Sequence, residues 1–302
     1  MIGGTMTRAA TNPGTVPDDY IVKSLRVLAF EQSTGKCVSN KRYTAENGDV
    51  IKHSIDAGDY NFVFLANEPL HELIINKLNG ITKYADLDEI AYPEYFFSSE
   101  QIIPMMQEIK GVKVLSGGQG VVLSDNTTVD PLQLALERLA VRVDVVLESE
   151  DDLEDIFSGL VFENIPDVVP LTSNYQGTVG QNNTRTLSKD DDGSYFSDET
   201  PTNGRMWAKR ISRIAKELST VGDKTKAVIL TVDMGSHYSP FCELQIASNP
   251  VNYSLPGNTM LDLHGIIKEP LEMNIKASKW VDVDNNWNID NQRILRISHV
   301  DN

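Results

Sequence analysis

Cysteine, basic residues and long apolar runs are scarce in this chain of 302 residues, and each scarcity excludes a class of protein. The two cysteines, Cys37 and Cys242, form no CxxC pair, which excludes a disulfide-dense scaffold and a cysteine-based zinc site. Lys and Arg total 27 against 43 Asp and Glu, and the net charge of −16 excludes general nucleic-acid binding. The longest apolar runs, 61–66 and 139–147, fall far short of the ~20 residues that span a bilayer.

Catalytic and metal-binding motifs are missing as well. The five histidines are scattered without an HExxH or His-x-His pattern, and the chain has no GxSxG, GxxxxGKS/T or GxGxxG motif. Residues 188–199 follow the spacing of a calcium loop, but Ser188 is a wrong first ligand and flanking helices are not expected, so a plain acidic loop is the favoured interpretation. We therefore expect a non-enzymatic protein without a cofactor or a metal site.

Strand-length apolar segments between turn residues predict an all-β chain with minor helices. The pattern lacks βαβ alternation, which favours two antiparallel β-sandwiches in tandem over a parallel nucleotide-binding sheet. Residues 50–55 and 60–67 are expected to form a hairpin whose second strand is buried on both faces. The other predicted strands are 21–30, 112–115, 120–123, the second half of 131–148, 156–165, 168–171, 227–232, 241–247, 261–267, 271–277 and 293–298.

Helices and long loops are predicted at few places. Apolar residues at helical spacing predict short helices at 69–78 and 206–221. Residues 173–205 are mostly small and polar, so we expect a long loop there.

The domain division follows from composition. The acidic cluster 148–155 cannot be buried and marks a connection near the middle of the chain. We expect an N-terminal β-sandwich domain over residues 1–135, opening with an extended arm at 1–19, and a C-terminal β-sandwich domain over 136–302.

The three tryptophans keep a binding function open. Trp207, Trp280 and Trp287 would form a stacking platform for sugars if their rings were exposed on a β-surface, whereas core packing is the more common role of such rings. A surface glycan-binding protein is therefore the alternative from a different functional class.

Four segments taken together, in their order and spacing, resemble the FimA-type fimbrillin family, the pilins of type V fimbriae on Gram-negative anaerobes. No single segment is a catalytic signature, and the specificity comes from the combination. The segments are 21–30, 57–67, 136–143 and 162–166.

This resemblance implies a secreted lipoprotein precursor with two transthyretin-like sandwich domains, located at the cell surface in a fimbria associated with the outer membrane. A trypsin-like protease cuts members of the family after an arginine near the mature N-terminus, and here Arg8 followed by Ala9 fits that position. The family's lipidated cysteine and signal segment are not part of this sequence, which predicts a longer precursor.

The resemblance further implies polymerisation by protease-triggered β-strand exchange, in which a C-terminal segment of one subunit completes the next. The implied partners are other pilin subunits, in a homopolymer or a mixed fimbria, the processing protease, and a receptor on a host or bacterial surface. A fimbrial tip or anchor subunit stays an alternative to the shaft role. Residues 293–300 alternate imperfectly, and the apolar candidates for the donor strand are Ile289, Ile294, Leu295, Ile297 and Val300.

Overall fold

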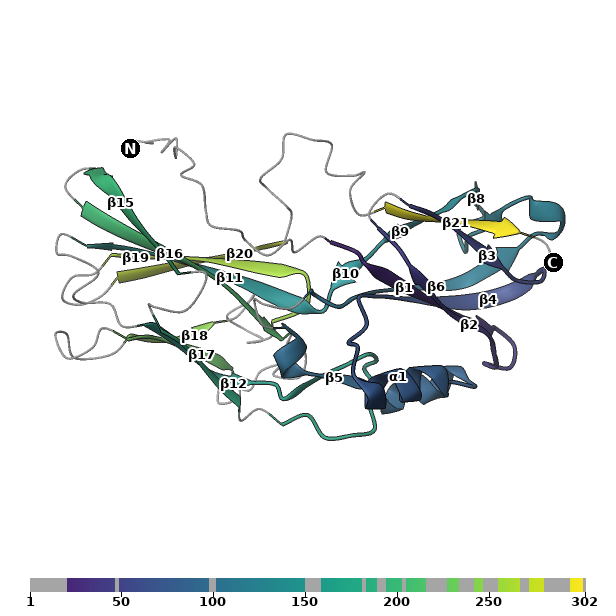
Figure 1. Cartoon of the computed structure of the whole chain (residues 1–302), viewed down its shortest axis with the longest axis horizontal. Coiled ribbons are helices and arrows are strands. Elements are labelled where there is room, and N and C mark those ends of the chain that lie inside the picture. Colours follow the sequence, from purple (N-terminus) through teal and green to yellow (C-terminus); the bar gives the residue numbers. More distant parts are fainter. Residues whose placement is uncertain are drawn as a thin grey trace.

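Strands dominate the structure, a computed structural model, and the predicted all-β class with minor helices is confirmed (Figure 1). Antiparallel pairing prevails, and the parallel pairs among the described strands are β11 with β19 and β21 with β3. The structure describes residues 21–46, 49–97, 102–149, 159–180, 183–188, 194–202, 205–215, 227–233, 242–246, 255–266, 272–279 and 294–300.

The N-terminal half is built on one sheet that is covered on both faces. Val27 and Phe64 point into one core and Leu28 and Val63 into the other, because successive side chains of a strand alternate between faces. The doubly buried strand predicted at 60–67 is thereby confirmed. The sheet runs in the order β2 (Cys37–Thr44), β1 (Ser24–Glu31), β4 (Gly58–Ala66), β6 (Met105–Val114), β7 (Val121–Val122) and β8 (Thr128–Val129), and β10 (Glu137–Arg138) pairs with β6.

Short helices cover one face of this sheet. Helix α1 (Glu72–Asn79) matches the helix predicted at 69–78 and buries Ile74 and Leu78 against the sheet. The 3-10 turns η1 (Tyr84–Glu89) and η2 (Glu94–Phe97) add further apolar residues to the same core, and η3 (Ser116–Gly118) lies in the connection between β6 and β7.

A three-stranded layer covers the opposite face. It has the order β3 (Val50–Ser54), β21 (Ile294–Val300) and β9 (Leu132–Ala135), so the last strand of the chain lies in the N-terminal half. The hairpin predicted for 50–55 and 60–67 is therefore wrong. Strand β4 pairs with β1 on one edge and β6 on the other, which leaves no edge for β3.

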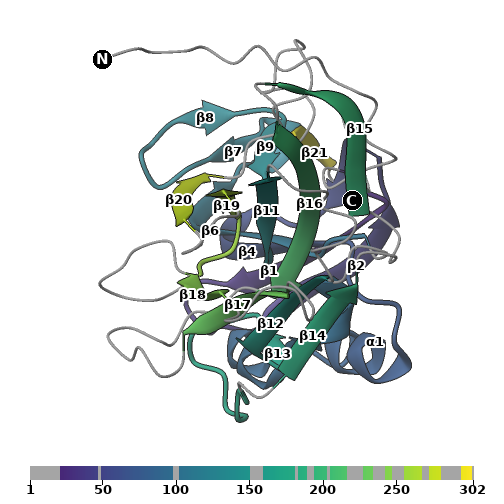
Figure 2. The ribbon, with the colours of Figure 1, turned by 90° about the vertical axis from the view of Figure 1, so that its left-hand side faces the viewer.

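The second half of the chain forms a sandwich of two sheets, which lie one above the other in Figures 1 and 2. Val143 and Leu261 from the upper sheet share a core with Phe162 and Leu230 from the lower one. The upper sheet is β15 (Ser194–Thr202), β16 (Arg205–Ala215), β11 (Ala140–Ser149), β19 (Thr259–Ile266) and β20 (Glu272–Lys279), and the lower is β14 (Asn183–Ser188), β12 (Gly159–Ile165), β17 (Val228–Asp233) and β18 (Cys242–Ile246).

Two sequence predictions fail in this half. The helix predicted at 206–221 is wrong, because residues 205–215 form β16 and pair with β11 from Ala140 to Ser149. A single amphipathic helix is marginal without a surface to pack on, and a long strand ladder outweighs its local propensity. The long loop predicted at 173–205 is also wrong, since this range contains β14 and β15.

Polar contacts and a small sheet connect the two halves. Strand β5 (Ala91–Pro93) pairs with β13 (Val168–Pro170), and the buried Arg138 donates from Nη1 to Oδ1 of Asn258 over 2.9 Å. Glu94 and Arg185 form an ion pair between η2 and β14. The strands pass from the first sheet to the second between β10 and β11, and the division of the chain at residues 135 and 136 stays our proposal.

Candidate functional site

Strand β21 is the central strand of the layer that it shares with β3 and β9, and we call these two flanking strands the acceptor pair. It runs parallel to β3 from Arg296 to Val300 and antiparallel to β9 from Ile294 to Ile297. Among the described residues, β3 and β9 pair with no other strand. Figure 1 shows the yellow β21 lying between them, above β4 and β6. The layer therefore depends on a segment from the far end of the chain.

The acceptor pair has one buried face and one exposed face. Ile51 and His53 on β3 and Leu132 and Leu134 on β9 are buried, whereas the residues between them are exposed. Of these, Ile51, Leu132 and Leu134 pack on the same core as Phe62 and Phe64 of β4, whose rings stack with centroids 5.7 Å apart. The pattern is that of a half-buried strand on each side of β21.

The pairing fixes which residues of β21 share the buried face of the acceptor pair. Ile297 is in register with Ile51 on one side and Leu132 on the other, and Leu295 is in register with Leu134. Paired residues of neighbouring strands lie on the same face of a sheet. Leu295 and Ile297 thus occupy register positions of the inner face.

The alternate residues of β21 have exposed register partners. Ile294 is in register with Ala135, and Ser298 with Lys52. Val300 is in register with the half-buried Ser54. The register therefore separates the candidate donor residues into two groups that the sequence pattern does not distinguish. The remaining candidates, Ile289, Arg8 and Ala9, lie outside the described residues.

A buried histidine stands at the end of the acceptor pair. The Nδ1 atom of His53 lies 2.8 Å from the hydroxyl of Tyr43, and the two rings meet edge to face at 6.0 Å. Burial raises the pKa of Tyr43 above its ordinary value. His299 of β21 is the register partner of His53.

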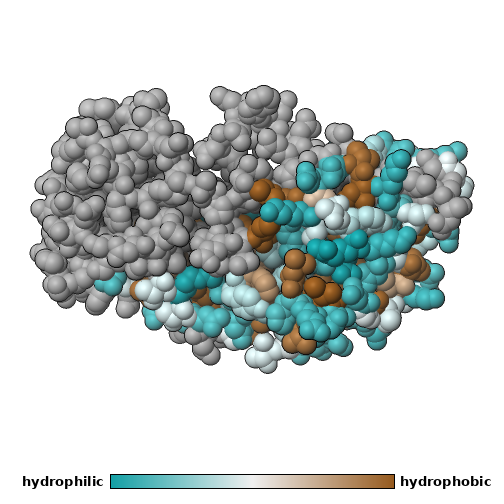
Figure 3. All heavy atoms as spheres, viewed as in Figure 1, coloured by the Kyte–Doolittle hydropathy of each residue, from teal (hydrophilic) through white to brown (hydrophobic). Residues whose placement is uncertain are grey.

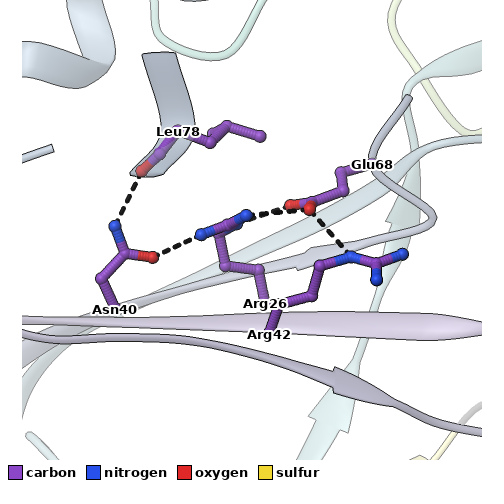
Figure 4. A network of polar contacts seen from close by, with 5 residues as sticks. All are labelled: Arg26, Asn40, Arg42, Glu68 and Leu78. Atoms are coloured by element: carbon purple, nitrogen blue, oxygen red, sulfur yellow. Dashed lines mark hydrogen bonds and ion pairs between the residues drawn. The ribbon is translucent and has the colours of Figure 1, made fainter. Parts of the chain in front are cut away.

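A cluster of buried charges holds the other face of the N-terminal sheet (Figure 4). Nε and Nη2 of Arg26 donate to the two carboxylate oxygens of Glu68 over 2.6 and 2.9 Å, and Nε of Arg42 lies 2.9 Å from the same carboxylate. Asn40 accepts from Nη1 of Arg26 and donates to the carbonyl of Leu78. The cluster ties β1, β2 and α1 to the segment after β4.

The other sequence candidates give no second site. Cys37 is a free cysteine. Burial raises the pKa of its thiol and the charge of Asp86 adds to this shift, whereas a backbone hydrogen bond with Ser39 opposes it. The acidic loop predicted at 188–199 is wrong in its second half, since residues 194–199 belong to β15; Ser188 ends β14, and 189–193 lie outside the described residues. Trp280 and Trp287 also lie outside them, and only the backbone of Trp207 is described. Among the described residues, no group of three or more His, Cys, Asp or Glu is placed to hold a metal ion.

The described surface shows no large apolar patch on the face in Figure 3, where hydrophobic residues lie in small groups among hydrophilic ones. Leu70 and Leu73 are the most exposed large apolar side chains of the described residues. No described helix is long and apolar enough to span a membrane.

Comparison with known proteins identifies the N-terminal half. Residues 2–135 match the family described as "Major fimbrial subunit protein (FimA)", a range that contains both acceptor strands. This match assigns residues 2–135 to the FimA-type fimbrillin family. No curated protein sequence gives a significant match to this chain.

Solved structures of fimbrial and adhesion proteins share its fold. The tip fimbrial protein Mfa3 from Porphyromonas gingivalis, with C-terminal truncation, is 12% identical, with a TM-score of 0.60; the match covers 87% of this chain and 96% of that chain. Candidate cell adhesion proteins from Parabacteroides distasonis and Bacteroides eggerthii are 14% and 13% identical, each with a TM-score of 0.52. The first match covers 94% of this chain and 96% of the Parabacteroides chain, and the second covers 97% of this chain and 94% of the Bacteroides chain. At these identities the likeness concerns the fold.

Sequence reasoning missed the acceptor pair, although its signal is present. Ile51, His53 and Ile55 alternate with polar or exposed residues, and so do Leu132 and Leu134, as half-buried strands require. The sequence does not reveal which strand lies between β3 and β9, because strands that pair over a long distance in the chain leave no local pattern.

Proposed function

We propose that this fimbrillin is a structural, non-enzymatic subunit of a cell-surface fimbria and that it assembles by β-strand exchange. One observation carries the proposal: a terminal strand, β21, is the central strand of a layer whose other members, β3 and β9, have no other described partner. An exposed strand edge offers unpaired N–H and C=O groups to any extended segment, and an intermolecular strand satisfies them in the same way as an intramolecular one.

The energetics favour an occupied acceptor pair. Ile51, Leu132 and Leu134 are all buried beside β21, and fully burying such a side chain contributes about 1.5–3 kcal/mol. Without a strand between β3 and β9, these residues and the facing backbone edges would meet water. A chain that loses its own β21 from this place gains stability by accepting the same strand from another copy.

We further propose that processing after Arg8, before Ala9, starts assembly, that the precursor is a lipoprotein exported to the outer membrane, and that the fimbria supports adhesion to a surface receptor. The family resemblance supports these points. The donor residues that we favour are Leu295 and Ile297, because their register partners are buried.

A tip subunit is the second candidate. The likeness to the tip protein Mfa3, with a TM-score of 0.60, favours it over an anchor subunit. A shaft subunit must both donate and accept a strand, whereas a tip subunit needs only one of the two functions.

The test is size analysis and electron microscopy of the full-length precursor after limited trypsin treatment, with intact mass to locate the cut. Filaments or ladders together with a new N-terminus at Ala9 would support strand exchange and a shaft subunit. Cleaved protein that stays monomeric at every concentration would overturn the shaft role, and co-assembly with a separate shaft protein would then identify the tip role.

A further inference from the structure

We propose that residues 84–97, a segment of the N-terminal half that we call the clasp, hold the two halves of the chain together as one cooperative unit. The clasp contains η1, β5 and η2. Linked domains usually move and unfold separately unless a large apolar interface joins them. The inference concerns the single subunit and goes beyond the proposed strand exchange. In a filament, this coupling would let tension cross a subunit without separating its halves, a consequence that rests on the proposed function.

The beginning of the clasp is anchored to the N-terminal sheet. The backbone N–H of Tyr84 donates to the carbonyl of Gly35, in the turn between β1 and β2, over 2.8 Å. The ring of Tyr84 meets that of Phe30 edge to face, with centroids 5.3 Å apart. Leu87 is buried in the core that α1 covers. The first turn of the clasp is therefore fixed in the N-terminal half.

The rest of the clasp pairs with the second half of the chain. In Figure 1, β5 lies between α1 and β12 of the second half. Strand β5 is antiparallel to β13, and Tyr92 is in register with Val169. Three backbone hydrogen bonds flank this ladder, from Gln176 to Asp88 (2.7 Å), from Leu171 to Ile90 (3.1 Å) and from Glu94 to Asp167 (2.9 Å). The backbone contacts therefore extend along the clasp from η1 to η2.

Two side-chain contacts join the same two segments. The hydroxyl of Thr172 donates to Oδ1 of Asp88 over 2.5 Å. Glu94 forms an ion pair with Arg185 of β14, and their side chains are only 13% and 17% exposed. Charges shielded from water in this way are screened less than exposed ones, so reversing one of them would place two like charges between the halves.

One apolar core runs through the clasp from one half to the other. It contains Leu65 and Leu78 of the N-terminal half and Phe162 and Leu230 of the second half. The clasp adds buried side chains to this core, namely Leu87, Ile90, Tyr92 and Phe97. The other core of the N-terminal sheet is formed, among the described side chains, by residues 22–136 alone. Separating the halves at the clasp would expose apolar surface on both sides, which is the condition for cooperative unfolding.

Urea unfolding of the full-length chain tests the clasp with one probe in each half. All three tryptophans follow residue 135, so their fluorescence reports the second half. Amide hydrogen exchange of peptides from β1 and β4, measured by mass spectrometry, reports the first. Leu263→Ala supplies a destabilisation in the second half, because Leu263 is buried in β19, whose strand partners in the described part of the chain all belong to that half.

We expect Leu263→Ala to lower the urea midpoints of both probes equally, within about 0.2 M, because a cooperative unit unfolds as a whole. The variant Val169→Asp plus Arg185→Glu places two carboxylates against the clasp, one in register with Tyr92 and one opposite Glu94. In this background the m-value of the fluorescence transition should fall to roughly half, since m follows the surface exposed on unfolding. Leu263→Ala should then shift the fluorescence midpoint alone.

A milder charge series covers the case in which this variant does not fold. Glu94→Arg should reduce the part of the Leu263→Ala shift that reaches the N-terminal probe, and Glu94→Arg plus Arg185→Glu should restore it. Glu89→Arg, the same charge change at an exposed position of the clasp, should leave it complete. A Leu263→Ala shift confined to fluorescence in the otherwise wild-type chain would overturn the single cooperative unit. Equal shifts of both probes in every clasp variant would overturn the role of the clasp. Filament formation is not part of this measurement, so neither result bears on strand exchange.

Discussion

Glu68→Gln is expected to destabilise the protein strongly, because it removes the only carboxylate that contacts Arg26 among the described residues. The side chain of Glu68 is 0% exposed and that of Arg26 is 3% exposed, and two hydrogen bonds of 2.6 and 2.9 Å join them. The glutamine keeps the shape but replaces one oxygen by an amide donor and leaves the guanidinium without a counter-charge.

The magnitude follows from the burial of the pair. Removing one partner of a buried ion pair costs about 3–5 kcal/mol, because the other charge stays desolvated. Arg42 contributes little to this figure, since its side chain is 38% exposed and water compensates for the lost contact. At about 2–4 °C per kcal/mol for a domain of this size, we expect the unfolding midpoint to fall by about 6–20 °C.

The assay is urea and thermal unfolding followed by circular dichroism, with Glu46→Gln as the control that changes the same charge at an exposed position. Arg42→Ala should lie between the two. A free energy of unfolding for Glu68→Gln within about 0.5 kcal/mol of the control would refute the reasoning, because that is the range of an ordinary surface substitution.

Three further predictions concern assembly and the free thiol. Ile297→Asp should abolish filament formation, because the charge is placed in register with buried Ile51 and Leu132, while Ser298→Asp should leave filament yield near the wild-type level. Arg8→Ala should block processing of the full-length precursor and leave monomers by electron microscopy; normal filaments would remove this residue from the mechanism. Alkylation of Cys37, followed by peptide mapping, should be slower in the folded than in the urea-unfolded protein and reach its half-maximal rate at a higher pH, since burial raises the thiol pKa. Equal rates would contradict that burial effect.

The sequence predicts strands well where burial imposes a clear pattern. The apolar run at 60–67 follows from burial on both faces of β4, and the predicted strand at 21–30 coincides with most of β1. It fails where pairing decides, as in β16, whose helical spacing of isoleucines is outweighed by its ladder with β11. The candidate donor strand is predicted only in part. The predicted strand at 293–298 nearly coincides with β21, but only the register with β3 and β9 shows which residues of β21 lie on the inner face.

The two faces of the N-terminal sheet are stabilised in different ways, and this difference would allow the proposed strand exchange to take place without unfolding of the whole sheet. One face is covered by α1 and the 3-10 turns that follow β4 directly, and the Arg26 and Glu68 pair fixes the start of this segment. The other face is covered by β3, β9 and a strand from the end of the chain. Loss of β21 uncovers only the second core, while the first core and its buried ion pair remain intact. Glu68→Gln should therefore lower the stability of monomer and filament alike, whereas Ile297→Asp should act on assembly.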